Sequence, residues 1–573
     1  MGRMRTCRIF SESRCTVVIV SQLVFPYLAH LSVVSRYKGP LNLFTQSTEC
    51  HGCPLLHRTT IRTGANASIS VDTKHPIRYE LRDHGDGVLP NCSYVDHFGE
   101  RGSYLLNVSY DGTCTRDVTE DPINIYYPLG VAAAVFVCLI IVWRSIKFLK
   151  RKNFFRETLR SYSFSSQEVI LGRAVISDGM VQQPASPVRK RLRSLDTFRG
   201  LALVVMVFVN YGGGKYWFFQ HSPWNGLTVA DLVFPWFIWI MGTSMAMSVR
   251  SLLRKGVTKR QIFLKSLRRS CILFVLGLIL NTIGTDGNLR HIRIPGVLQR
   301  FGISYLVTCS VHLLRARRQD DNRGGDILPY WPEWLVMLPL LALHVCLTFL
   351  LHVPGCGRGY LGPGGLAMNE TYYNCTGGAA GYIDRIILSE NHLYQRGAAK
   401  KMYHTLVPHD PEGILGSITS IFLVFLGLQA GKTLITFSKW TSRVARWCLW
   451  GLLCGIAAGA LCQFSKEDGL IPINKNLWSV SYILAMSASA YVLLSLLYIV
   501  IDVQGWWSGA PFFYPGMNSI LVYVGHELTH GLFPWFWLCY ETHYCYLFMN
   551  LWATSLWVFI AFVLYRKGFF LSV

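Results

Sequence analysis

The sequence contains few charged residues for its length. Only 15% of its 573 residues are Asp, Glu, Lys or Arg, whereas a soluble protein usually has about 25%. Hydrophobic residues make up 51% of the chain and occur in long runs, which excludes an ordinary soluble protein. Aromatic residues, at 13%, supply ample surface to bury and exclude a disordered chain. The bilayer is therefore the expected solvent.

Acidic residues are the scarcer charged type. The chain has 32 Asp and Glu against 55 Lys and Arg, which gives a formal net charge of +23. Such a charge can attract nucleic acid, an anionic membrane surface or a polyanionic substrate, so its distribution along the chain has to decide between them.

About eleven apolar runs have the length of a membrane span. They cover residues 125–143, 198–216, 228–249, 267–283, 294–314, 333–352, 414–431, 444–463, 476–501, 515–535 and 550–565. We therefore predict a polytopic α-helical membrane protein with about 11 transmembrane helices and a small β-rich luminal N-terminal domain.

Two independent signals predict the same topology. Lys and Arg gather in every second connection between the runs, which marks those connections as cytosolic. The asparagine-glycosylation triplets all fall on the other side, at Asn66, Asn91, Asn107, Asn369 and Asn374. The N-terminal domain is thus expected in a lumen and the C-terminus in the cytosol. The excess positive charge then orients the spans, and no nucleic-acid partner is expected.

The chain divides into five predicted parts. These are a signal peptide or signal-anchor (1–34), a luminal β-rich domain (35–124), a first transmembrane helix (125–143), a cytosolic basic linker (144–195), and a ten-helix domain (196–573) with a luminal cap loop (353–413). The β-rich prediction rests on alternating runs such as ASISVDT, IRYEL and SYLLNVSY.

Six cysteines lie in the predicted oxidising compartment and can form disulfides with a connectivity that spacing leaves open, namely Cys50, Cys53, Cys92, Cys114, Cys356 and Cys375. For the Cys50-His-Gly-Cys53 motif a disulfide is favoured over half of a zinc site, because a zinc site needs two more ligands.

Polar residues near the ends of the second and third runs are the first candidates for chemistry. His221, in a luminal loop, is a candidate general base or nucleophile with Asn210 nearby, although a lone loop histidine is more often a surface or capping residue. Arg193 and Arg199, at the cytosolic entrance, can hold the phosphates of a coenzyme or simply anchor the span.

Asp231 and Arg300 are expected at similar depths, about one and two turns below the luminal ends of their spans. We predict that they pair, or bridge through a bound ligand such as the coenzyme. A buried pair that only fixes helix packing is the alternative.

The sequence HELTH, from His526 to His530, fits the H-E-x-x-H zinc pattern. No third ligand stands at a diagnostic spacing, so we expect no metal and predict that His526 and Glu527 line a substrate pocket. The cap loop offers further polar groups that suit sugar hydroxyls or an ammonium, namely Asp384, His404, Asp410 and Glu412. A glycosylated cover without ligand contact is the alternative for that loop.

From about Leu192 onward the chain resembles the heparan-α-glucosaminide N-acetyltransferases of the transmembrane acyltransferase superfamily. The resemblance extends over roughly two thirds of the chain and rests on LRSLDTFRG, VFVNYGGGKYW, WNGLTVADLVFPWF, RIPGVLQR, VPGCGRGYLGPGG, NCTGGAAGYIDR, HDPEGILG, IPINKNLWS and PFFYPGMNSILVYVGHE. It is weaker in the N-terminal domain.

The resemblance implies that acetyl moves from cytosolic acetyl-CoA to the terminal non-reducing α-glucosamine amine of heparan sulfate in the lysosomal lumen, during heparan sulfate degradation. It also implies a homodimer in the lysosomal membrane, with His221 as the active histidine and Asn210 orienting the thioester or the imidazole. Direct transfer and an acetyl-imidazole intermediate both stay open. A transporter of a sugar or organic anion and an intramembrane zinc metalloprotease are the alternative functions.

Overall fold

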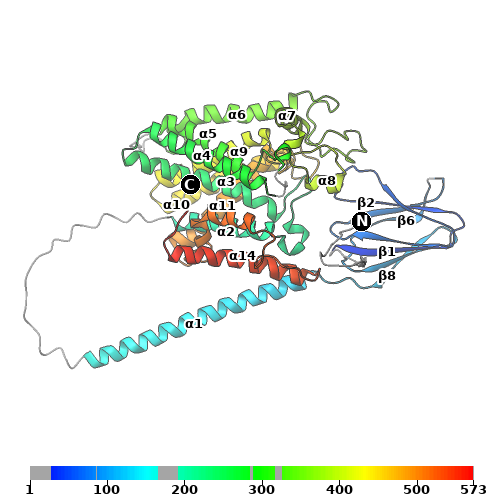
Figure 1. Ribbon diagram of the computed structural model, residues 1–573, viewed down its shortest axis with the longest axis horizontal. Helices are drawn as coiled ribbons and strands as arrows, with labels where there is room; N and C mark the ends of the chain where they lie inside the picture. The colour runs from blue at the N-terminus through cyan, green and yellow to red at the C-terminus, as the bar shows by residue number, and fades with distance from the viewer. Residues whose placement is uncertain (1–26, 86, 166–191, 284–287, 317–324, 572–573) are drawn as a thin grey trace, which may run out of the picture.

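The computed structural model describes residues 27–85, 87–165, 192–283, 288–316 and 325–571. The described residues contain eight strands. Figure 1 shows the strands as a domain of their own, placed against one end of a bundle of helices. We call residues 27–124 the β-domain, the end of the bundle that contacts it the β-domain end, and the opposite end the far end. The long connection between α6 (Trp331–Leu350) and α9 (Ile414–Thr436) also lies at the β-domain end (Figure 1).

The β-domain is a sandwich of two four-stranded sheets, with strand orders β4-β1-β7-β8 and β3-β2-β5-β6. All neighbouring strands are antiparallel except β1 and β7. The alternating runs predict this arrangement correctly, because every second side chain points into the space between the sheets. The strands are β1 Leu28–Ser35, β2 Leu41–Ser47, β3 Leu56–Ile61, β4 Asn66–Asp72, β5 Ile77–Arg82, β6 Val88–Asp96, β7 Ser103–Val108 and β8 Cys114–Glu120.

The predicted boundary between leader and domain, at residue 34, is wrong. Strand β1 begins at Leu28 and pairs with both β4 and β7, and Leu31 and Val33 are fully buried in the sandwich. The apolar residues that resemble the end of a leader are therefore sheet core. The remainder of that prediction, residues 1–26, lies outside the described residues.

The six cysteines expected in the oxidising compartment form three disulfides, Cys50–Cys53, Cys92–Cys114 and Cys356–Cys375. The second joins β6 of one sheet to β8 of the other, and the third closes part of the cap loop. The disulfide prediction for the Cys50-His-Gly-Cys53 motif is confirmed.

The predicted glycosylation sites all lie in the β-domain or the cap loop. Asn107 is half-buried and donates to Asp117 Oδ2, and the other four side chains are exposed.

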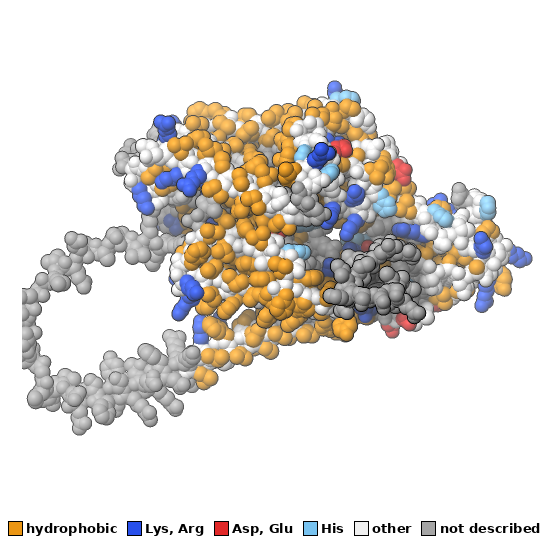
Figure 2. Space-filling view, viewed as in Figure 1, with side chains coloured by type: hydrophobic (Ala, Val, Ile, Leu, Met, Phe, Trp, Pro, Cys, Tyr) orange, Lys and Arg blue, Asp and Glu red, His pale blue; other side chains and the backbone are white. Residues whose placement is uncertain are grey.

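The described residues contain eight helices that are long and apolar enough to cross a membrane. These spans are Tyr127–Leu149, Val229–Arg254, Val297–Arg315, Leu328–Leu350, Ile414–Thr436, Trp440–Cys462, Val480–Val503 and His543–Arg566. They confirm a polytopic helical membrane protein. Hydrophobic side chains cover most of the bundle's face in Figure 2, as lipid contact requires.

The helices are α1 Tyr127–Ser165, α2 Arg193–Asn210, α3 Val229–Arg254, α4 Lys259–Asn281, α5 Val297–Arg315, α6 Trp331–Leu350, α7 Gly378–Leu388, α8 Ala398–Tyr403, α9 Ile414–Thr436, α10 Trp440–Cys462, α11 Val480–Leu497, α12 Phe513–Met517, α13 Ser519–Leu528 and α14 His543–Arg566. Helices α2 and α4 coincide with two further predicted runs but are not among the eight apolar spans. Helix α1 continues to Ser165, past the predicted start of the cytosolic linker at residue 144, and its apolar span is Tyr127–Leu149. Residues 166–191 of the predicted linker lie outside the described chain.

The predicted span 515–535 is wrong as a single helix. It contains α12, of 5 residues, and α13, of 10 residues, and α13 ends at Leu528. Ten residues rise only about 15 Å, about half of the hydrocarbon thickness. The composition is apolar enough for a span, but Asn518, whose backbone is not helical, separates α12 from α13.

The bundle core is organised around α9, which packs closely on α3. A Cβ on Gly242 of α3 would lie 2.0 Å from the Val424 carbonyl oxygen, and one on Gly427 of α9 would lie 1.9 Å from the Trp239 carbonyl oxygen. The two backbones can approach this closely only because both positions lack a side chain. The Thr243 hydroxyl then donates to the Gly427 carbonyl across the contact at 3.0 Å.

We expect Gly427→Ala to destabilise the protein, because the new methyl group meets backbone that cannot rotate away. Overpacking of this kind costs about 1–3 kcal/mol. Thermal unfolding of the purified protein in detergent measures the effect. Gly455→Ala is the control, since a Cβ there meets the Ala488 Cβ at an ordinary 3.7 Å. Equal unfolding midpoints for the two variants would contradict the close α3–α9 packing.

Candidate active site

His221 and Asp231 form the centre of the candidate site. Asp231 lies in the first turn of α3, and its buried carboxylate accepts the Thr228 backbone N–H at 3.1 Å and the Thr228 hydroxyl at 3.0 Å. The same carboxylate accepts His221 Nδ1–H at 2.7 Å and the Ser222 N–H at 3.2 Å. A carboxylate only accepts, so the ring proton stands on Nδ1 and Nε2 carries the lone pair, which faces the Lys475 ammonium at 3.1 Å. The His221 side chain is 47% exposed and can reach a substrate.

The loop from Tyr211 to His221 turns sharply to bring His221 to α3. Gly212, Gly213 and Gly214 all have positive φ, at 117°, 56° and 65°, a region that glycine enters without strain. After this turn the chain folds back onto the end of α2. The Phe219 ring packs edge-on against the ring of Phe208 in α2, with the ring centroids 5.1 Å apart. The three glycines in VFVNYGGGKYW are therefore required by the turn.

Lys475 joins the site from the connection between α10 and α11. Its Nζ lies 2.8 Å from Nδ1 and 3.1 Å from Nε2 of His221, and 3.5 Å from Asp231 Oδ1. The Asn474 side chain donates to Asn225 Oδ1 at 2.9 Å and so holds the Lys475 connection beside the His221 loop. Sequence reasoning missed Lys475. It stands in the motif IPINKNLWS, but a lysine in a polar loop gives no signal of its own.

Three other predicted residues come together beside this loop. The Asn210 amide, at the end of α2, lies 2.9 Å from His526 Nε2 and 3.2 Å from Glu527 Oε1. The spacing of HELTH does not make a zinc pair here. Helix α13 ends at Leu528, before His530. His530 stacks on the Tyr211 ring at 6.0 Å, whereas His526 contacts the edge of that ring at 6.1 Å and bonds to Asn210. The two histidines therefore do not share a helical face.

A cavity of about 300 Å³ opens among α2, α3, α4, α5 and α13. It is lined mainly by apolar and aromatic side chains, with polar groups from Arg199, Ser244, Ser248 and Arg269. Arg199 donates to the Ser244 hydroxyl at 2.6 Å, and the Arg269 guanidinium lies 4.7 Å from the Tyr305 ring. Sequence reasoning identified Arg199 but missed Arg269, which looked like one more orienting charge in a basic loop.

The cavity lies next to His526 and further along α3 than Asp231, and its lining contains no residue of the His221 centre. Its lining residue Tyr523 contacts the His526 ring at 5.3 Å, and Phe237 lies about 9 Å along α3 from Asp231. Arg193 lies at the far end of the bundle, at the start of α2. Its side chain is exposed, and its backbone N–H donates to Asp502 Oδ1 at 3.2 Å. The predicted coenzyme residues on α2 thus lie at the far end, and the predicted catalytic residues lie at the β-domain end.

The predicted pairing of Asp231 with Arg300 is wrong. Arg300 is 1% exposed, donates to the carbonyl oxygens of Pro411 and Gly413 at 3.0 Å each, and lies 4.4 Å from the Trp478 ring. Asp231 bonds to His221 and Lys475 instead. The depth of a residue along its helix does not define the direction in which its side chain points. The similar depths of Asp231 and Arg300 were therefore not sufficient to predict a contact between them.

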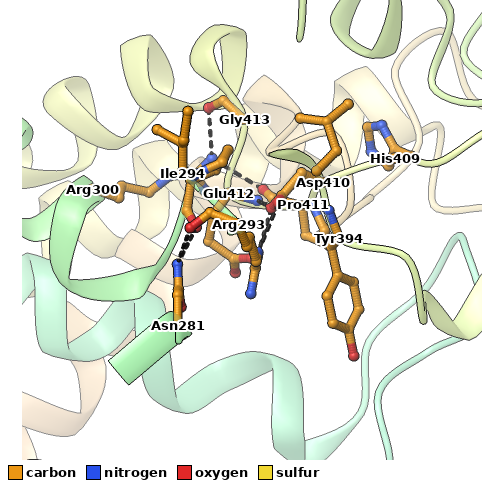
Figure 3. A network of polar contacts seen from close by, with 12 residues as sticks. Asn281, Arg293, Ile294, Arg300, Tyr394, His409, Asp410, Pro411, Glu412 and Gly413 are labelled. Carbon is orange, nitrogen blue, oxygen red and sulfur yellow. Dashed lines mark hydrogen bonds and ion pairs between the residues drawn. The ribbon is translucent and has the colours of Figure 1, made fainter. Parts of the chain in front are cut away.

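Acidic residues of the cap loop bind a second arginine, as Figure 3 shows. Arg293 donates to Asp410 at 2.7 and 2.6 Å and to Glu412 at 2.5 Å, and Asp410 also accepts the Tyr394 N–H. Asp384 is buried and accepts the Ile414 N–H at the start of α9. Of the four cap-loop residues predicted to bind substrate, these three brace the loop against the bundle, while His404 is exposed.

These contacts shift the acid–base behaviour of the cap loop. Burial raises the pKa of Asp384 to about 7. Burial also acts to raise the pKa of Glu412, but the guanidinium groups of Arg293 and Arg300 outweigh it and hold that pKa at about 2. The ion pair with Arg293 therefore contributes its full stability above the ordinary carboxyl pKa of about 4.3, and loses it only as the pH falls toward 2.

We expect Arg293→Met to lower stability by about 3–5 kcal/mol at neutral pH, because two buried carboxylates lose their cation. The loss should shrink as the pH falls toward about 4.5, since unpaired buried carboxyls take up protons more readily. Thermal unfolding at both pH values measures this. Arg290→Met, at an exposed neighbour, is the control, and a variant as stable as the wild type would show that the cap loop does not depend on this network.

Comparison with known proteins places this arrangement in a family. Residues 191–319, which include His221, Asp231 and Arg300, match the family model described as heparan-alpha-glucosaminide N-acetyltransferase, catalytic. The human protein named heparan-alpha-glucosaminide N-acetyltransferase is 44% identical over 539 residues, covering 88% of this chain and 81% of the human one. The mouse protein of the same name is 41% identical over 570 residues, covering 93% and 86%. The chain therefore belongs to the heparan-α-glucosaminide N-acetyltransferase family.

Proposed function

We propose that the chain transfers the acetyl group of acetyl-CoA to the amine of a terminal non-reducing α-glucosamine of heparan sulfate, during heparan sulfate degradation. The observation that carries this proposal is the His221–Asp231 hydrogen bond beside a cavity that extends toward the far end. A histidine base oriented by a carboxylate is suited to acyl transfer to an amine. The substrates are proposed from the name of the related human and mouse proteins.

The reaction requires a proton to leave the sugar amine. His221 Nε2 accepts that proton as the amine attacks the thioester carbonyl, and Asp231 stabilises the imidazolium that forms. Lys475 donates to Nε2 in this structure. In the proposed reaction its ammonium turns from Nε2 to the thioester oxygen when the substrates bind, which frees Nε2 for the amine proton and stabilises negative charge that develops on that oxygen. His221 then returns its proton to the departing thiolate, so the products are an amide and a thiol.

The acceptor sugar binds, in this proposal, at the group formed by Asn210, His526 and Glu527. Asn210 holds both side chains through its amide, so its role in this proposal is to orient them. The Glu527 side chain is 38% exposed and offers a carboxylate that binds a sugar hydroxyl or the sugar ammonium. In the second case the carboxylate takes up one ammonium proton, which leaves the neutral amine that attacks the thioester.

The donor suits the cavity among α2, α3, α4, α5 and α13. Its apolar walls fit the acetylated arm of the coenzyme, and Arg199 and Arg269 are the groups in its lining that can hold phosphates. Arg193 extends this basic surface at the far end. Arg300 and Asp231, which the sequence also assigned to the coenzyme, have other partners, as described above.

We further propose that the protein lies in the lysosomal membrane, with the β-domain in the lumen and the C-terminus in the cytosol. The glycosylation triplets and disulfides at the β-domain end, and the Lys and Arg of the opposite connections, support this orientation. A homodimer, a cleaved leader and the lack of a metal requirement stay predictions. A transporter or a zinc protease would leave the His221–Asp231 pair without a role.

Acetylation of glucosamine by the purified protein, given acetyl-CoA, tests the proposal. We expect His221→Ala to lower kcat by about 10²–10⁴-fold, the usual value of a positioned base. Asp231→Asn should also lower kcat by about 100-fold or more, because the ring loses its orienting charge. His30→Ala, on the exposed side of β1, is the control. Near-normal turnover of His221→Ala would refute the proposal.

Direct transfer and a covalent route use the same residues, and one further measurement separates them. Labelled acetyl-CoA without acceptor leaves label on His221 only if an acetyl-imidazole forms.

A further inference from the structure

One buried histidine joins the β-domain, α14 and the loop that leads to His221. His543, the first residue of α14, is 7% exposed. Its Nδ1 lies 2.9 Å from the Gly214 carbonyl oxygen, and its Nε2 lies 3.0 and 2.9 Å from the two carboxylate oxygens of Glu100, in the β6–β7 connection. The Tyr216 ring stacks on the imidazole at 4.4 Å. We call Glu100, His543, Gly214 and Tyr216 the clamp.

The partners of His543 define its protonation state. A carbonyl oxygen and a carboxylate both accept hydrogen bonds, so both ring nitrogens have to donate. A neutral imidazole has a single N–H, and only the imidazolium can make both contacts. Loss of one proton turns a nitrogen lone pair toward an oxygen, and it also removes the positive charge that balances the buried Glu100 carboxylate.

The loop is fastened to the β-domain at its other end as well. Gln220, which precedes His221, accepts from the Lys74 ammonium at 3.5 Å and donates to the Tyr27 hydroxyl at 2.8 Å. In the middle, the Gly214 N–H donates to Asn550 Oδ1 of α14 at 2.8 Å. The position of His221 therefore depends on how the β-domain and α14 hold residues 212–220.

The other charged and titratable groups around His543 come from the β-domain, the His221 loop and the start of α14. They are Lys74, Asp72, Arg101, Tyr27, Tyr216, Glu541 and Tyr544. Between about pH 5 and about pH 7.5 the side chains of Lys, Arg, Tyr, Asp and Glu ordinarily keep one protonation state. Histidine ordinarily changes its protonation state in this range. His75, whose ring lies 5.9 Å from the loop residue Trp217, is the second histidine against this loop.

We propose that Glu100 and His543 form an acid-dependent clamp that fixes the His221 loop in an acidic lumen and releases it near neutral pH. Glu100 and His543 are thus positioning residues, which act through Gly214 and Tyr216. The proposal rests on the proposed catalytic role of His221 and on the luminal placement of the β-domain. Its consequence is that the site is ordered only after the protein reaches an acidic compartment.

Hydrogen–deuterium exchange of the full-length protein in detergent tests the clamp without donor or acceptor. After correction for the intrinsic effect of pH, we expect amides of residues 212–219 to exchange about tenfold or more slowly at about pH 5 than at about pH 7.5. Because neither substrate is present, this result does not depend on acetylation, and a failure of the proposed function would not change it.

Glu100→Gln separates the clamp from a general effect of pH. A glutamine amide can accept from the imidazolium or donate to the neutral ring, so the variant should lose the difference between the two pH values. Glu120→Gln, at an exposed position of β8 in the same domain, should keep the wild-type difference. Equal exchange of the wild-type loop at both pH values would overturn the proposal, and so would a full difference in Glu100→Gln.

His75→Gln provides a second variant in case Glu100→Gln does not accumulate. The difference between the two pH values should persist in this variant, since His75 does not contact His543 or Glu100 in the clamp. Its disappearance would assign the acid dependence to His75 and overturn the clamp.

Discussion

The buried carboxylate of Asp231 is the constraint on which the candidate site depends. A charge buried at the end of a membrane helix is costly unless its oxygens are fully hydrogen-bonded, and Asp231 meets this requirement with groups from three parts of the chain. Thr228 supplies the helix cap, His221 and Ser222 supply the loop, and Lys475 supplies the balancing cation. Satisfying one carboxylate therefore also places and orients the imidazole. Structure and chemistry share the same hydrogen bonds.

The rest of the fold presents this centre to two different surroundings. The cavity lined by Arg199 and Arg269 extends away from it among five helices, while the β-domain and cap loop surround it at the opposite end. Arg293 and Arg300 attach the cap loop to the bundle through side-chain carboxylates and backbone carbonyls, and Glu100 attaches the β-domain through His543. A donor and an acceptor that never share a compartment can meet at such a boundary, which is what the proposed acetyl transfer requires.

Much of the architecture could be predicted from the sequence because it depends on local patterns. Apolar runs predict the long helices, alternation predicts the sandwich, and the topology signals identify the six cysteines that pair. His221, Asn210, His526 and Glu527 were recognised as candidates because they are polar residues beside spans. The hydrogen-bond and ion-pair partners of these side chains could not be predicted, because they depend on the direction in which each side chain points in the folded protein. Asp231 bonds to His221 and not to Arg300, Lys475 comes from a distant loop, and Asp410 and Glu412 bind Arg293.

Errors at boundaries have a similar physical origin. Composition alone cannot distinguish the apolar end of a leader from a buried strand, so the predicted leader, residues 1–34, includes most of β1. Nor can it show that Asn518 separates two short helices in a hydrophobic stretch, one of which brings His526 and Glu527 to Asn210.

The central claim is that one site joins a donor and an acceptor from opposite sides of the membrane. The most direct test reconstitutes the protein in sealed vesicles, with glucosamine trapped on the β-domain side and acetyl-CoA, which does not cross lipid, supplied only to the far side. We expect N-acetylglucosamine to appear on the β-domain side. Product formation only when both substrates share one side would contradict it.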